Sequence, residues 1–193
     1  MVVRVEVLGL YVDPGSGTSI VLVGETNKIT RVLPIFIGPA EAQAIAIGIQ
    51  GLRPPRPGTH DLIINVIDLM GARLVRVTVT GLQDGAFLAV LELDTPSGAQ
   101  MVDSRPSDGI ALAVRVGADI CIDQSVLDVA GVEVQHELTQ PFSEHQIEEI
   151  LAEFQEFLST AEPGDFEQPA TEPDIATGAN EEDLGGPGTV GDR

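Results

Sequence analysis

The stretch "VDSRPSDGIALAVRVGA", residues 102–118, places charge directly in front of a run of small apolar residues. Its polar members are Asp103, Arg105, Ser107 and Asp108. Pro106 suits the first turn of a helix, and the apolar residues continue to Val116, so we predict a helix over residues 106–116. The small size of these residues indicates a closely packed helix whose first turn is surrounded by charged groups.

The polar residues at the start of this helix allow two interpretations. In the structural one, Asp103 or Ser104 caps the helix, and Asp108 favours the positive end of its dipole. That interpretation leaves Arg105 unexplained, because the start of a helix prefers anions. An arginine there either pairs with a nearby carboxylate or binds an anion together with free backbone N–H groups. The second interpretation is therefore an anionic-ligand or metal site.

Strand patterns occupy much of the remaining chain. Three segments rich in β-branched residues and separated by turn-like sequences predict antiparallel strands at residues 2–12, 18–25 and 30–38. Residues 73–82 alternate cleanly and pair across "QDG" with residues 86–93, and residues 98–103 add a short strand. Residues 119–123 fit a brief strand or an extended link. Because hairpins replace a strict alternation of strands and helices, we predict an α+β fold with a mixed, largely antiparallel sheet and helices packed against it.

Three further segments predict helices. In residues 38–51, a helical spacing predicts one packed face, formed by Ala42, Ile45, Ala46 and Ile49. The segment "HDLIINVIDLMG", residues 60–71, is apolar on most sides, so we expect Thr59 to cap a deeply covered helix. Ser143 and Gln146 form a capping box at the start of an amphipathic helix that runs to residue 159.

The charge of the chain is strongly negative, with a formal net value of −20. We predict a core domain at residues 1–138, a C-terminal amphipathic helix at residues 139–159 and a disordered acidic tail at residues 160–193, which has almost nothing to bury. Residues 1–158 are acidic as well, with 21 acidic residues against nine basic ones. Long-range attraction to nucleic acid is therefore not expected, and phosphate chemistry needs a local basic patch or bound cations.

The sequence favours a soluble cytoplasmic protein without membrane association. No basic and apolar leader opens it, and no apolar run approaches the length that spans a bilayer. The single cysteine, Cys121, cannot form an internal disulfide and stands in an apolar stretch, where we expect a small buried side chain.

Two other predicted helix starts are polar. Glu41 lies in the first turn of the helix at residues 38–51, and "RPGTHDL", residues 56–62, gathers Arg56, His60 and Asp61. Taken alone, His60 fits a surface residue, a metal ligand or a general base. The sequence contains no Gly-rich dinucleotide motif, P-loop, zinc spacing or serine-hydrolase motif. If the three helix starts meet, they form a pocket of carboxylates, which hold Mg²⁺ or Mn²⁺, and arginines, which hold phosphate oxygens.

The stretches "LPIFIGPAEAQAIAIGI", "RPGTHDL" and "VDSRPSDGIALAVRVGA" together resemble the bifunctional nuclease family of bacteria and plants. The resemblance runs from about Val2 to Leu138. It implies an α+β fold, nuclease activity on both RNA and DNA, as in plant members, and self-association. The polar residues of the shared motifs are Glu41, His60, Asp61, Asp103, Arg105, Ser107 and Asp108. Gly109 stands where the family often has alanine.

Two hypotheses of function follow. In the first, the protein is a metal-assisted nuclease acting on RNA or DNA. Its catalytic residues are Glu41, His60, Asp61 and Asp108, its metal ligands Asp61, Asp103 and Asp108, and its substrate-binding residues Arg56, Arg105 and Ser107. The metal is Mg²⁺ or Mn²⁺, which activates an attacking water, and His60 transfers a proton. In the second, the protein is a non-catalytic, homo-oligomeric binding module for a protein or a small anionic ligand, and Arg105 and Asp108 belong to an internal salt-bridge and capping network.

Overall fold

The computed structural model describes residues 1–13, 15–26, 30–83, 85–134 and 142–160. Apart from Thr160, the predicted acidic tail lies outside the described residues. Within the described part of the chain, eight strands form one sheet in the order β6-β5-β4-β7-β1-β2-β3-β8. The strands are β1 (Val2–Val12), β2 (Ser19–Glu25), β3 (Arg31–Ile37), β4 (Arg73–Gln83), β5 (Ala86–Thr95), β6 (Gly98–Ser104), β7 (Asp119–Asp123) and β8 (Val132–Glu133).

The sheet is mixed and largely antiparallel, as predicted. Hairpins join β1 to β2, β2 to β3, β4 to β5 and β5 to β6, and β4 and β7 form the parallel pair. In that pair Val77 lies opposite Ile120. The segment 119–123 is therefore a true strand, and it lies in the middle of the sheet between β4 and β1. The two-residue strand β8, which pairs with β3, was not expected from the sequence.

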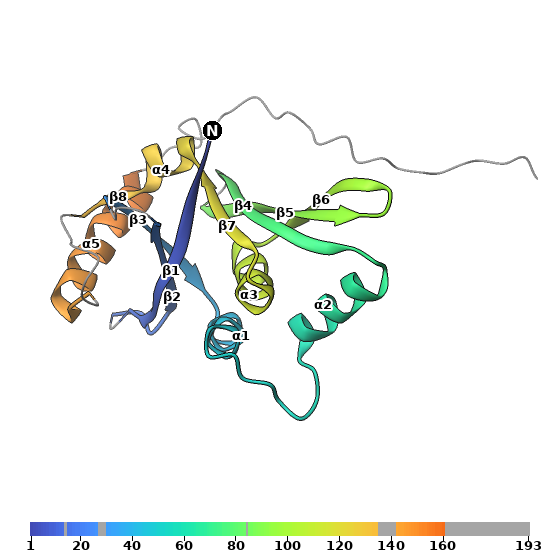
Figure 1. Ribbon diagram of the computed structural model, residues 1–193. Coiled ribbons are helices and arrows are strands. Elements are labelled where there is room, and N and C mark those ends of the chain that lie inside the picture. The colour runs from blue at the N-terminus through green and yellow to red at the C-terminus, as the bar shows by residue number, and fades with distance from the viewer. Residues whose placement is uncertain (14, 27–29, 84, 135–141, 161–193) are drawn as a thin grey trace, which may run out of the picture.

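Five helices accompany the sheet in the described residues, and the α+β class is confirmed (Figure 1). They are α1 (Pro39–Ile49), α2 (Thr59–Leu69), α3 (Pro106–Val116), α4 (Gln124–Ala130) and α5 (Glu144–Thr160). None of the helices in these residues is long and apolar enough to cross a membrane.

The helix α3 is the crossover between β6 and β7 and the most deeply packed helix. Its residues Ile110–Ala113 are all buried beneath the sheet. A Cβ on Gly109 would lie 2.5 Å from Cγ1 of Val77, so this glycine lets the backbone of α3 approach β4 closely. The small residues of the opening stretch are thus explained by close packing of a helix on a sheet.

The helix α1 packs on α3 through a different face from the one predicted. Of the expected set, Ile45 is buried, but Ile49 is half exposed. The contact with α3 is made around Gly48, where a Cβ would lie 2.5 Å from Cγ2 of Val114. Because successive residues are about 100° apart around a helix, a contact centred on Gly48 turns Ile49 away from α3.

The prediction of a deeply covered α2 is wrong. Only Ile67 of this helix is buried, while Leu62 and Leu69 are 57% and 87% exposed. The helix rests on α3 and the start of β4 and stands at the margin of the molecule (Figure 1). No other described element covers its outer face, so its apolar residues meet solvent. Thr59 is also not the cap: Gly58 is the N-cap residue, and its N–H donates to the Asp61 carboxylate over 2.8 Å.

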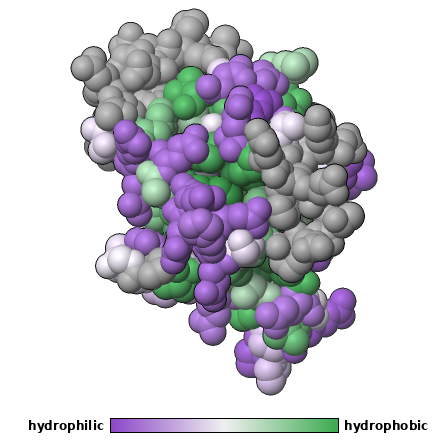
Figure 2. Space-filling view, turned by 90° about the vertical axis from the view of Figure 1, so that its left-hand side faces the viewer, coloured by the Kyte–Doolittle hydropathy of each residue, from purple (hydrophilic) through white to green (hydrophobic). Residues whose placement is uncertain are grey.

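The helix α5 starts and packs as its sequence predicts. The Ser143 N–H donates to Oε1 of Gln146 over 2.9 Å, which forms one half of the capping box. The apolar residues Ile147, Ile150, Leu151 and Phe154 are buried in the same core cluster as the sheet. The side of the molecule that carries α5 and β3 shows hydrophilic residues over its middle, with hydrophobic residues between them (Figure 2). Cys121 on β7 is buried, as expected.

Candidate functional site

The first turns of α1, α2 and α3 border one cavity of about 350 Å³. Each helix begins directly after a residue with extended backbone, Gly38, Gly58 or Arg105, so the chain turns sharply into the helix at the cavity. Proline occupies the first helical position of α1 and α3, where its fixed φ angle costs no hydrogen bond. The charged or titratable lining residues are Glu41, His60, Asp61, Arg105, Asp108 and Arg115.

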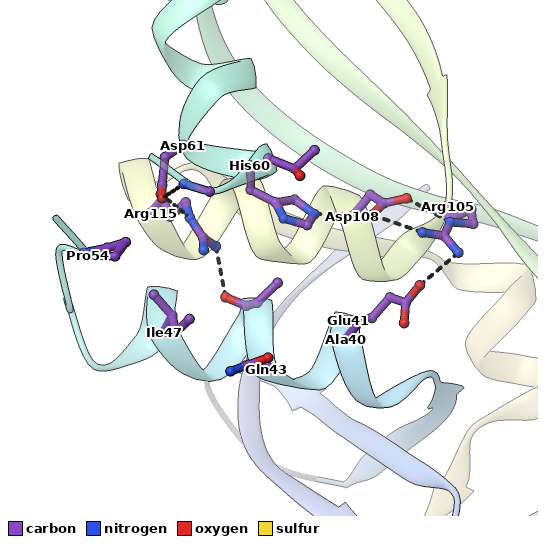
Figure 3. Close-up of a pocket in the computed structure, with 13 residues that line it drawn as sticks. Ala40, Glu41, Gln43, Ile47, Pro54, His60, Asp61, Arg105, Asp108 and Arg115 are labelled. Carbon is purple, nitrogen blue, oxygen red and sulfur yellow. Dashed lines mark hydrogen bonds and ion pairs between the residues drawn. The ribbon is translucent and has the colours of Figure 1, made fainter. Parts of the chain in front are cut away.

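Four of these side chains form a continuous chain across the cavity (Figure 3). The Glu41 carboxylate on α1 lies 3.0 Å from Nη1 of Arg105. The Arg105 guanidinium also donates two hydrogen bonds to the Asp108 carboxylate, from Nε over 2.7 Å and from Nη2 over 3.2 Å. The second partner of Asp108 is Nε2 of His60 on α2, at 3.1 Å. One ionic network thus joins three helix starts that are far apart in the sequence.

The remaining pair, Asp61 and Arg115, lies at the other end of the cavity. The Nε atom of Arg115 donates to the Asp61 carboxylate over 2.8 Å, and Nη1 donates to the carbonyl oxygens of Ala44 and Ala111. The Arg115 side chain is only 11% exposed. The Arg115 side chain therefore links α1, α2 and α3 through its hydrogen bonds.

The two aspartates are held in their ionised form. The hydrogen bond from Arg115, helped by the Gly58 N–H, places the pKa of Asp61 below its usual value. Burial acts to raise the pKa of Asp108, but the hydrogen bonds from Arg105 and His60 outweigh it, and the pKa is lowered. The same contact with Asp108 raises the pKa of Arg105. At neutral pH both carboxylates therefore accept hydrogen bonds and donate none.

Three of the predicted site residues, Arg56, Asp103 and Ser107, do not line this cavity. Arg56 and Asp103 are exposed and make no side-chain hydrogen bond or ion pair with a described residue. Ser107 is 6% exposed and lines a neighbouring cavity instead. The predicted cap of α3 by Asp103 or Ser104 is also wrong, because Arg105 is the N-cap residue and the Ser104 hydroxyl donates to its carbonyl oxygen.

The arrangement of the carboxylates does not fit a preformed site for Mg²⁺ or Mn²⁺. No three His, Cys, Asp or Glu side chains that could hold a metal ion gather anywhere in the described residues. Asp61 is engaged by Arg115, and Glu41 and Asp108 are both engaged by Arg105. A metal would have to replace an arginine at one of these carboxylates, so the predicted metal ligands remain a prediction.

Arg115 is the residue of the site that the sequence analysis missed. It follows Asp108 by seven residues, two turns of helix, and so lies on the same face of α3. This seven-residue spacing from Asp108 could have identified Arg115 as a site residue from the sequence. It was hidden because Arg115 stands in the last turn, where a basic residue is already expected to favour the helix dipole.

A comparison with protein families places this arrangement in context. The model of the bifunctional nuclease domain matches residues 20–135, which include all three helix starts. The chain belongs to the bifunctional nuclease domain family. It is also 39% identical over 163 residues to an uncharacterized protein of Mycobacterium tuberculosis, found in strains CDC 1551/Oshkosh and H37Rv, and the match covers 84% of this chain and 97% of the relative. The family membership supports a nuclease-like domain and leaves the activity itself to be tested.

Proposed function

We propose that the protein hydrolyses phosphodiester bonds of RNA or DNA at the cavity between α1, α2 and α3. The observation that supports this proposal is the chain Glu41–Arg105–Asp108–His60, which puts a cation and a proton-transfer group side by side. In an acidic protein, such a local cation is what a phosphate requires.

Arg105 is the residue that binds the phosphate. A guanidinium has five N–H donors, and Glu41 and Asp108 take three of them in this structure. The side chain is 65% exposed, so the remaining two donors are open to a non-bridging phosphate oxygen. Paired donors of this kind also stabilise the charge that develops on those oxygens during attack.

His60 is the residue that moves a proton. Because the ionised Asp108 can only accept, the proton of the neutral imidazole lies on Nε2, and Nδ1 carries a free lone pair. Nδ1 makes no hydrogen bond to a described residue. A water molecule attacks phosphorus while Nδ1 takes one of its protons. The bond from phosphorus to the sugar oxygen breaks, that oxygen takes a proton from solvent, and Asp108 stabilises the imidazolium that forms.

The experiment compares His60→Asn with His145→Asn on labelled single-stranded RNA and DNA. General acid–base groups contribute about 10²–10⁴-fold to a rate, so His60→Asn should lower kcat at least about a hundredfold. His145 on α5 is 78% exposed and pairs only with Glu149 among the described residues, so its variant should keep the wild-type rate. Unchanged hydrolysis in both His60→Asn and Asp108→Asn would contradict the proposal.

The same assay tests the metal and the substrate. Rates are measured in excess EDTA and with added Mg²⁺ or Mn²⁺, on RNA and DNA of the same base sequence. Because arginines and His60 supply the cation and the proton-transfer group in this proposal, we expect hydrolysis to continue in excess EDTA. Complete loss of hydrolysis in EDTA, with recovery on adding either ion, would instead show the metal-assisted form of the nuclease hypothesis.

A second candidate, an oligomeric binding module, is favoured by one observation. The outer face of α2 exposes the apolar residues Leu62, Ile63, Val66 and Leu69, with Met70 directly after the helix. Because the chain carries a net charge of −20, an uncharged face is where two acidic copies repel each other least. If this candidate is right, the wild type self-associates in sedimentation experiments, Leu69→Asp is monomeric, and neither protein hydrolyses nucleic acid.

A further inference from the structure

A second cavity, of about 260 Å³, lies on the other side of the Glu41–Arg105 pair. Both residues line it as well as the first cavity, so the ion pair forms a shared wall. The remaining walls come from the end of β3, the start of β5, the first turn of α3 and one face of α5.

The walls of this second cavity are aromatic. Phe36 of β3 and Phe87 of β5 flank Phe154 of α5, with ring centroids 5.9 Å and 6.2 Å from it. The rings are nearly parallel, at interplanar angles of 25° and 13°. Phe154 is buried, but Phe36 and Phe87 remain partly exposed. They therefore offer ring surface on which a flat aromatic ligand can stack.

The same walls include a polar group, the hydroxyl of Ser107. The Ser107 side chain is 6% exposed and lines the cavity, and its hydroxyl makes no hydrogen bond to any described residue. The fully buried side-chain atom without a hydrogen-bond partner in the described residues is Oγ1 of Thr26. The Ser107 hydroxyl lines the cavity, where it can bond to water or to a ligand. A hydroxyl both donates and accepts, which suits the polar edge of a heterocyclic base.

The size and position of the cavity limit what it can hold. Its volume falls below the 300–1,000 Å³ that is usual for pockets of drug-sized ligands, so one ring system is its natural content. The ligand must also continue past Arg105, because that guanidinium separates the aromatic cavity from the catalytic one. A nucleotide has this form: a flat base joined through a sugar to a phosphate.

We propose that the cavity between Phe36, Phe87 and Ser107 binds the base of the nucleotide whose phosphate contacts Arg105. This inference rests on the proposed function, because it takes Arg105 as the phosphate-binding group. It adds a substrate subsite to that function. The base stacks on the exposed ring surface, as bases do in proteins that bind single strands, and its polar edge bonds to the Ser107 hydroxyl.

The test measures binding without turnover, by calorimetric titration of the full-length protein with the four ribonucleoside 5′-monophosphates and with ribose 5-phosphate. The sugar phosphate is the matched ligand that lacks only the base. We expect the best nucleotide to bind at least about tenfold more tightly than ribose 5-phosphate, which corresponds to stacking of one base. Equal affinities, or no binding of any nucleotide, would overturn the proposal.

Two variants and one control locate the site. Ala86 lines the cavity from an exposed position at the start of β5, so Ala86→Leu narrows the cavity without entering the core. Ser107→Ala removes the hydroxyl that lines the cavity and breaks no hydrogen bond to a described residue. Both should weaken nucleotide binding severalfold and leave ribose 5-phosphate unaffected, whereas Ala99→Leu, at an exposed position of β6, should change neither. Nucleotide affinities that stay at the wild-type value in both variants would show that the base binds elsewhere.

The outcomes separate this inference from the proposed function. Tight nucleotide binding that both variants weaken, without hydrolysis of any nucleic acid, supports the base subsite and removes the nuclease. Hydrolysis that depends on His60, with no difference between nucleotides and ribose 5-phosphate, supports the nuclease and removes the base subsite.

Discussion

Arg115 of α3 and Asp61 of α2 form an ion pair, with 2.8 Å between Nε and Oδ1, at the end of the cavity away from the proposed phosphate. The same guanidinium donates to the carbonyl oxygen of Ala44 on α1. Arg115 therefore links α1 and α2, which carry Glu41 and His60, to α3, which carries Asp108. Only Ile67 of α2 is buried, and this pair and the His60–Asp108 hydrogen bond are polar links that join the helix to α3.

We predict that Asp61→Asn destabilises the protein by about 2 kcal/mol, because it leaves the largely buried Arg115 without its counter-charge. The matched control is Asp94→Asn, which breaks the exposed pair of Asp94 with Arg73. Exposed pairs contribute about 0–1 kcal/mol, so the control should lose much less. Urea unfolding measures both changes. Equal losses in the two variants would show that burial of Arg115 does not matter.

The same pair predicts a pH dependence of stability. The pKa of Asp61 is lower in the folded protein than in the unfolded chain, where an aspartate titrates near about 3.9. The stabilisation is thus fully present above the unfolded value and is lost as the pH falls through the folded value. The difference in free energy of unfolding between wild type and Asp61→Asn should be constant at neutral pH and shrink below about pH 4. A difference that grows on acidification would contradict this origin.

The sequence predicted where the strands and helices lie better than it predicted which elements pair or pack with one another. The hairpins and the starts of α1, α3 and α5 follow from local signals: turn residues, prolines at the first helical position and a capping box. The insertion of β7 between β4 and β1 depends on packing across the whole sheet, and no local pattern encodes it. The exposure of α2 was missed for the same reason, because an apolar sequence does not reveal whether another element covers it.

In the candidate site too, the residues marked by local signals were predicted and those whose position depends on the fold were not. Helix-start chemistry identified Glu41, His60 and Asp108, which share the network around Arg105. Arg56 and Asp103 were included because they are close in sequence to those residues, but the chain is extended at β6, and Asp103 faces solvent there. Closeness in sequence predicts a shared element and does not predict a shared face. Arg115 was missed because it stands in the last turn of α3, where a basic residue is already expected to favour the helix dipole.

We predict that Gly109→Ala destabilises the protein. The added Cβ would lie 2.5 Å from Cγ1 of Val77 and 3.2 Å from Cδ2 of Leu91, so β4 or α3 must shift. Overpacking of this kind costs about 1–3 kcal/mol. Val77→Ala removes the closest atoms, so the double variant should be more stable than the sum of the two single losses implies. Additive losses, measured by thermal and urea unfolding of all four proteins, would show that the contact is relieved in another way.

The last prediction separates the two hypotheses of function at Arg105. A lysine keeps the charge but cannot contact Asp108 through two nitrogens while also reaching Glu41 and a phosphate, so Arg105→Lys should lower kcat/KM at least about tenfold. Because the side chain is 65% exposed, Arg105→Lys and Arg105→Ala should each change the free energy of unfolding by less than about 1 kcal/mol. Arg73→Lys, at an exposed pair on β4, is the control for the chemical change and should leave kcat/KM at the wild-type value. An internal salt-bridge network predicts the reverse pattern: a large loss of stability in Arg105→Ala, and no hydrolytic activity in the wild type for the lysine variant to reduce.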